Sequence, residues 1–202
     1  MAADPIILAF DTSAAHCAAA LLRDGDVVAE RIEEMARGQA ERLMPLLEEL
    51  LTEAGLGWKE LDAVAVGIGP GNFTGIRISV SAARGLALGL GKPAIGVSVL
   101  EAQAEGVARP CLSLADARRG MSYAQVLTEA GGETPDMTDS PETLHPELPR
   151  APIADPATLA PAIARIAAAR LATGEPISRP APLYIRAADA APPRDPAPVI
   201  LP

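Results

Sequence analysis

Apolar and polar residues form a strand pattern at the start of the chain. The apolar run Ile6–Phe10 ends at Asp11-Thr12-Ser13 and predicts a buried strand. The β-favouring runs His16–Leu22 and Val27–Ile32 lie on either side of an Asp-Gly pair, which is typical of a hairpin. The pattern therefore predicts three antiparallel strands.

A helical period follows. Leucines recur at three- and four-residue spacing between residues 38 and 54, which predicts an amphipathic helix with its glutamates off the apolar stripe. Further along, the pattern predicts strand Ala63–Ile68, helix Phe73–Leu90, strand Ala94–Val97 and a helix capped by Ser98 that extends to about Val107.

A second hairpin pattern begins at Cys111–Ala115, a strand that ends at Asp116. The turn Arg118-Arg119-Gly120 separates it from a returning strand, Tyr123–Thr128. This order of strand, acidic residue, turn and strand resembles that of residues 6–32. It predicts two related lobes, each beginning with a hairpin around an acidic residue.

The composition changes after this hairpin. Fifteen of the 20 prolines lie at or beyond Pro135, so residues 134–152 are expected to be irregular, although Ala157–Leu171 still predicts a helix. We expect an N-terminal lobe at residues 1–106, a smaller C-terminal lobe at 107–191 and a mobile tail at 192–202.

Charge and motifs limit the classes of function. The net charge of −9 argues against strong independent binding to nucleic acid and favours a basic partner. No apolar stretch reaches the roughly 18 residues of a membrane span, and the first residues do not resemble a signal peptide. We therefore expect a cytoplasmic protein. The chain has no CxxC pair and no HExxH motif, so no metal site is expected.

The glycine-rich segment Gly67–Arg77 joins a predicted strand to a predicted helix. Glycines and the N–H groups at a helix start can hold a phosphate, or they can simply allow a tight turn. The dinucleotide fingerprint GxGxxG fails, because Asn72 stands where the third glycine is needed. Both interpretations stay open.

Two acidic residues, Asp11 and Asp116, follow predicted strands and would face a common cleft between the lobes. Alternatively, each begins a turn through its own side chain. Arg77, Arg118 and Arg119 could bind phosphate or carboxylate, or pair with surface acids. The candidate contacts for an anion or nucleotide are Asp11, Thr12, Ser13, Gly69, Gly71, Asn72 and Asp116.

The predicted helix Phe73–Leu90 is rich in small residues around its whole circumference, which lets another helix approach closely. Together with the leucine-rich helix it would form a dimerisation surface, unless both helices are satisfied within the fold. The candidate interface residues, some of which must face the core, are Leu43, Leu46, Leu47, Leu50, Ile76, Val80, Ala83 and Leu86.

Four segments resemble the bacterial TsaB (YeaZ) family: ILAFDTS, GIGPGNFTGIRISVSAARGLALGLGKPAIGVSVLEA, DARRGMSYAQ and PLYIR at Pro182–Arg186. The resemblance implies an α/β, actin-like and sugar-kinase-like (ribonuclease H-like) fold of two lobes, with the second lobe reduced. It also implies a role in forming threonylcarbamoyladenosine in tRNAs that read codons beginning with A. In that family the paralogue TsaD transfers the group, and TsaB is its non-catalytic partner.

Departures from the catalytic relatives agree with a partner role. Related catalytic members carry two histidine metal ligands on the helix that here contains Gln39 and Leu43. Their first turn reads DxGT, with a glycine between the acid and the hydroxyl, whereas this chain has Asp11-Thr12-Ser13 without that glycine. The resemblance thus implies no catalytic residue and no metal, with at most weak or interface-dependent binding of ATP or ADP with magnesium.

The partners implied by the resemblance are TsaD in a heterodimer, TsaE through the complex, tRNA only through the complex, and a second copy in isolation. Two alternatives remain open. One is an ATP-binding phosphotransferase or ATPase that acts in the cleft between the lobes, and the other is a glycoprotease-like peptidase.

Overall fold

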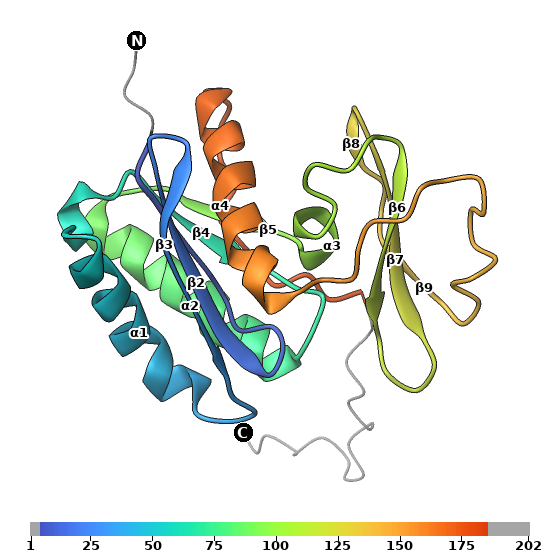
Figure 1. Cartoon of the computed structure of the whole chain (residues 1–202), viewed down its shortest axis with the longest axis horizontal. Coiled ribbons are helices and arrows are strands. Elements are labelled where there is room, and N and C mark those ends of the chain that lie inside the picture. Colours follow the sequence, from blue (N-terminus) through green and yellow to red (C-terminus); the bar gives the residue numbers. More distant parts are fainter. Residues whose placement is uncertain (1–4, 186–202) are drawn as a thin grey trace, which may run out of the picture.

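The computed structural model describes residues 5–185, whose helices and strands are arranged around two sheets (Figure 1). The elements in chain order are β1 (Ile7–Asp11), β2 (His16–Arg23), β3 (Asp26–Glu34), α1 (Gln39–Glu53), the 3₁₀ turn η1 (Trp58–Glu60), β4 (Ala63–Gly67), α2 (Phe73–Leu90), β5 (Ala94–Val97), α3 (Val99–Ala102), β6 (Cys111–Asp116), β7 (Ser122–Thr128), β8 (Gly131–Gly132), β9 (Asp136–Thr138) and α4 (Pro156–Ala172). Most bounds match the predicted ones to within two residues.

The first sheet has five strands in the order β3-β2-β1-β4-β5. β1 is central, antiparallel to β2 and parallel to β4, and every residue of β1 and β4 is buried. Because β1 and β4 run in the same direction, their final residues, Asp11 and Gly67, lie at the same edge of the sheet. This edge contains the strand-end turn, Asp11-Thr12-Ser13.

Helices cover both faces of the first sheet (Figure 1). Leucines of α1 and apolar residues of α2 pack with Leu8 and Phe10 on one face. Ile163 and its neighbours in α4 pack with Ile7 and Ala9 on the other. Alanine is frequent in the second cluster, as expected for a chain with few aromatic residues, so α4 lies close to the strands.

The position of α4 differs from the predicted lobe boundary. The sequence placed this helix within the C-terminal lobe at residues 107–191, whereas its apolar side covers the first sheet. Arg170 of α4 donates hydrogen bonds to Glu101 and to the carbonyl of Gly96, which fix the helix there. The physical reason is burial, because without α4 the apolar side chains on this face of β1 and β4 would contact water.

The second sheet contains β6, β7, β8 and β9, with β7 pairing to the other three. The helix predicted after Ser98 is shorter than expected, since α3 ends at Ala102 and the chain continues in tight turns to a left-handed Gly106. The stretch 134–152, predicted to be irregular, contains the edge strand β9. Within residues 5–185, none of the helices has both the length and the apolar character needed to cross a bilayer. The predicted mobile tail at 192–202 lies outside the described residues.

Candidate functional site

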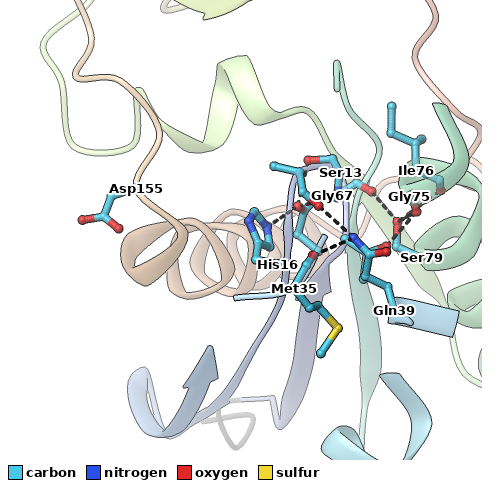
Figure 2. Close-up of polar contacts among 12 residues, drawn as sticks. Ser13, His16, Met35, Gln39, Gly67, Gly75, Ile76, Ser79 and Asp155 are labelled. Carbon is cyan, nitrogen blue, oxygen red and sulfur yellow. Dashed lines mark hydrogen bonds and ion pairs between the residues drawn. The ribbon is translucent and has the colours of Figure 1, made fainter. Parts of the chain in front are cut away.

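The strand-end turn is buried and held by its own hydrogen bonds (Figure 2). Oδ1 of Asp11 accepts three of them: from the N–H of Ser13 at 2.8 Å, from the Ser13 hydroxyl at 2.8 Å and from Nε2 of His16 at 2.9 Å. The hydroxyl of Thr12 donates to the carbonyl of Gly75 at 2.7 Å. Oδ2 of Asp11 is buried and has no hydrogen-bond partner among the described residues.

The glycines after β4 are explained by contact with this turn. A Cβ at Gly67 would overlap Oδ2 of Asp11, and a Cβ at Gly75 would overlap the carbonyl oxygen of Thr12. A Cβ at Gly71 would likewise overlap the backbone of Ser13. Glycine is therefore required at positions 71 and 75 because two backbone segments touch there, and at position 67 because the carboxylate of Asp11 lies against the backbone.

The N-terminus of α2 is capped by the protein itself. The side-chain oxygen of Asn72 accepts from the N–H groups of Thr74 and Gly75, at 2.9 and 3.1 Å. The N–H of Asn72 donates to the carbonyl of Ser13 at 2.6 Å. Since a helix start binds an anion through such N–H groups, these residues do not fit a phosphate at this site.

The structure does not join Asp116 to the strand-end turn. Asp116 is exposed at the end of β6, and its Oδ1 accepts from the N–H of Arg118 at 2.9 Å. Among the described residues, no hydrogen bond or ion pair links it to Asp11. The side chain of Asp116 shapes its own turn, which was the alternative interpretation from the sequence.

The residues near the start of α1 do not offer a metal site. Nε2 of Gln39 donates to the carbonyls of Ala14 and Met35, and Leu43 is buried in the core. No group of three or more potential ligand side chains occurs in the part of the chain that the structure describes.

The interface residues expected from the sequence need correction. Those named on α1, together with Ile76, Val80 and Ala83, are at most 2% exposed and lie between the helices and the first sheet. Leu86 is partly buried against the same cluster. The amphipathic stripe is covered by this chain's own sheet, so these side chains are not available to a partner.

The opposite side of α2 is exposed and has small residues along it. This α2 face consists of Ser81, Arg84, Gly85, Leu88 and Gly89. The side chain of Leu88 is 83% exposed, and a Cβ at Gly85 or Gly89 would meet nothing within 4 Å. Glycine inside a helix costs about 1 kcal/mol relative to alanine, and no contact within the described chain explains the two glycines.

Aromatic residues gather at the first turn of α2. The guanidinium carbon of Arg77 lies 3.8 Å from the ring centre of Phe73, and its Nε donates to the Tyr184 hydroxyl at 2.8 Å. The two rings are 5.0 Å apart, and both residues are almost half exposed. Such a stacked cation fits the ordinary geometry of a cation–π contact.

No role for His16 or Tyr184 follows from the sequence pattern. His16 is 3% exposed and bonds to Asp11, and its place five residues after that aspartate, across a predicted turn, was the available signal. Tyr184 lies in the segment Pro182–Arg186, of which Arg186 falls outside the described residues. Because this segment returns to the glycine loop through a bond from Leu183 to Ile68, its contact with Arg77 depends on the tertiary fold.

Comparisons with known proteins agree on one family. The family model described as "TsaD: tRNA N6-adenosine threonylcarbamoyltransferase" matches residues 26–167. The TsaB protein of Escherichia coli (strain K12) is 42% identical over 122 residues, 58% of this chain and 52% of that protein. A tRNA N6-adenosine threonylcarbamoyltransferase of Anaeromyxobacter dehalogenans is 40% identical over 111 residues, 47% of this chain and 33% of that protein.

A solved structure, YeaZ from Pseudomonas aeruginosa, is similar to this chain with a TM-score of 0.69 and 27% identity, over 89% of this chain and 99% of that one. This likeness and the strand order of the first sheet confirm the predicted α/β fold of the actin-like, ribonuclease H-like type. The matched stretch spans about half the length of the curated TsaB relative.

Proposed function

We propose that this chain, which belongs to the TsaB (YeaZ) family of tRNA threonylcarbamoyladenosine biosynthesis proteins, is a non-catalytic subunit that binds and supports the transferase TsaD. It takes part in forming threonylcarbamoyladenosine in tRNAs that read codons beginning with A. TsaD is its direct partner, and TsaE is reached through the complex. In isolation the same surface joins two copies of the chain.

The observation that carries the proposal is the α2 face. Gly85 and Gly89 leave room for the backbone of a second helix, and Leu88 between them is available as an apolar anchor. The aromatic cluster around Arg77 extends this face at the other end of the helix. Aromatic residues and arginine are enriched among the residues that dominate binding energy at interfaces.

The strand-end turn supports a structural role rather than an enzymatic one. A phosphotransferase of this fold needs a carboxylate and backbone donors that remain available to the nucleotide and its magnesium. Here Oδ1 of Asp11 already accepts three hydrogen bonds, Oδ2 is fully buried, and the donors at the start of α2 are capped by Asn72. Calorimetry with ATP and magnesium on the isolated chain tests this point. Micromolar binding that Asp11→Ala abolishes would favour the enzyme.

The test of the partner role uses Leu88→Glu and Gly85→Gln on the α2 face. A buried charge or a side chain in place of the glycine is expected to weaken TsaD binding at least about tenfold, equivalent to about 1.4 kcal/mol. Binding is measured by calorimetry with TsaD from the same genome, and circular dichroism checks the fold. Neither substitution removes a contact within the first sheet.

Ile153→Glu is the matched control, because Ile153 is 84% exposed and lies outside α2. It is expected to leave the affinity for TsaD unchanged. If both α2 variants bind TsaD as tightly as the original chain, the α2 face is not the interface. If the original chain does not bind TsaD at all, the partner role itself is wrong.

A further inference from the structure

The hairpin between β6 and β7 has an unusual backbone at its tip. Arg118, Arg119 and Gly120 have φ angles of 64°, 55° and 74°, all in the left-handed region. The N–H of Ala117 donates to the carbonyl of Met121, and the N–H of Met121 donates to the carbonyl of Arg118. Oδ1 of Asp116 accepts from the N–H of Arg118. We call Arg118, Arg119 and Gly120 the hairpin tip. In Figure 1 the turn that joins β6 to β7 lies at the lower end of the second sheet.

Arginine is an unfavourable choice for the first two of these positions. The left-handed region suits glycine, asparagine and aspartate, and any other side chain adds strain. Packing does not explain the choice, since Arg118 and Arg119 are exposed and make no side-chain hydrogen bond or ion pair with any described residue. Such outliers are typical of positions kept for function.

Some arginines of this chain are paired with acids, unlike those of the hairpin tip. Arg31, Arg42 and Arg165 each bond to one or more glutamates of a neighbouring element. Arg37 and Arg84 are exposed and likewise make no ion pair with a described residue, but neither has another arginine beside it in the chain. Two adjacent guanidinium groups on an exposed tip therefore form a local positive site on an otherwise negative molecule.

We propose that the hairpin tip binds the phosphate backbone of RNA directly. A guanidinium group can donate two parallel hydrogen bonds to a phosphate, and two neighbouring arginines can contact successive phosphates. A contact to phosphate is independent of base sequence and positions an RNA rather than identifying it. The choice of RNA as the ligand rests on the proposed function, and it goes beyond the sequence expectation that tRNA is reached only through the complex.

The surroundings of the tip favour RNA over an acidic protein. The centre of a protein interface usually contains apolar anchors and few charges. The large apolar side chains that are exposed in the described chain are Val28, Met44, Phe73, Leu88, Ile153 and Tyr184, and none of them lies in this hairpin. The tip thus offers charge without an apolar anchor, which suits a phosphate backbone in water.

The test replaces both arginines with asparagine, Arg118→Asn/Arg119→Asn, because asparagine tolerates the left-handed backbone. This double variant is expected to melt at the same temperature as the original chain or higher. Binding to an unmodified transcript of a tRNA that reads codons beginning with A is measured by fluorescence anisotropy on the full chain. The plot of log K against log salt has a negative slope, and its magnitude is expected to decrease by about 1.4 to 1.8. This corresponds to about 0.7 to 0.9 for each of the two lost phosphate contacts.

Two further double variants separate position from net charge. Arg23→Asn/Arg37→Asn removes two exposed arginines elsewhere and is expected to change the salt slope far less. Arg118→Lys/Arg119→Lys keeps both charges and is expected to keep most of the slope. If Arg118→Asn/Arg119→Asn and Arg23→Asn/Arg37→Asn reduce the magnitude of the salt slope equally, only net charge matters, and the proposal is overturned. A failure of the original chain to bind the transcript at about 50 mM salt would also overturn it.

The readouts distinguish this inference from the proposed function. TsaD affinity is measured for the same variants and is expected to be unchanged by Arg118→Asn/Arg119→Asn. Unchanged RNA binding with normal TsaD affinity overturns the inference alone. Polyglutamate that displaces the RNA from the original chain, and binds equally well itself, would show that the tip takes an acidic protein instead.

Discussion

Replacement of Asp11 by alanine tests whether the strand-end turn is a structural element or a functional site. The substitution removes the acceptor for three buried donors, which are the N–H and hydroxyl of Ser13 and Nε2 of His16. It also removes Oδ2, a buried oxygen with no partner in the described chain. The two losses have opposite effects on the free energy of unfolding.

The loss of the acceptor is expected to dominate. A buried donor without an acceptor costs about 1–3 kcal/mol, and Asp11→Ala creates three such donors. Removal of the unpartnered oxygen and entry of water return part of this cost. We expect a net loss of about 3 kcal/mol in the free energy of unfolding, which lowers the melting temperature by about 6–12 °C for a chain of this size.

Urea denaturation followed by circular dichroism gives the free energy and the m-value together. The m-value should not change if only the native state is weakened. Asp116→Ala is the matched control, because Asp116 also ends a strand but is exposed and accepts one N–H. Its effect should be about 1 kcal/mol or less. If Asp11→Ala is as stable as the original chain, or more stable, the turn is instead a strained functional site kept at the expense of stability.

Three further predictions concern the ion pairs of Arg42, the burial of Cys17 and the hydrogen bonds of Arg170. The hydrogen bonds from Arg42 lower the pKa of Glu33 and Glu49, so this pairing stabilises the fold above about pH 4.5 and is lost as the pH falls. Arg42→Met should lower the melting temperature more at pH 7 than at about pH 3, and an equal effect at both would contradict the pairing. Burial raises the pKa of the Cys17 thiol to about 11, so Ellman's reagent should modify it slowly until urea is added; labelling at the rate of an exposed thiol would refute this. Arg170→Met should cost about 1–2 kcal/mol in urea denaturation, because it leaves a backbone carbonyl and a glutamate of α3 without their donor; no loss would mean that apolar packing alone holds α4.

Local patterns in the sequence were sufficient for most elements of the first sheet. The Asp-Gly pair fixed the β2–β3 hairpin, and the leucine period located α1. The predicted bounds of the helix Phe73–Leu90 are those of α2 in the structure. These signals involve residues close together in the chain, so their physical basis, which is turn geometry, helix capping and periodicity, is present in the sequence itself.

The sequence could not show what covers each apolar face. The pattern makes the stripe on α1 and the residues Ile76 and Val80 on α2 candidates for a partner interface, although the first sheet of this chain covers them. An amphipathic pattern predicts that one face of a helix is buried, but it does not identify the element or the partner that covers this face. For the same reason α4 was placed in the second lobe, although it packs on the first sheet.

The glycine segment shows the same limit at the candidate site. From the sequence alone, Gly67–Arg77 favours a tight turn and leaves a phosphate loop open as the lesser alternative. Gly67 and Gly75 are in fact required by a segment more than 50 residues earlier, because Asp11 and Thr12 occupy the space of their missing side chains. The sequence by itself determined most elements of the first sheet, their order and the family. Only the tertiary structure decided which surfaces remain exposed, because that depends on contacts between residues far apart in the chain.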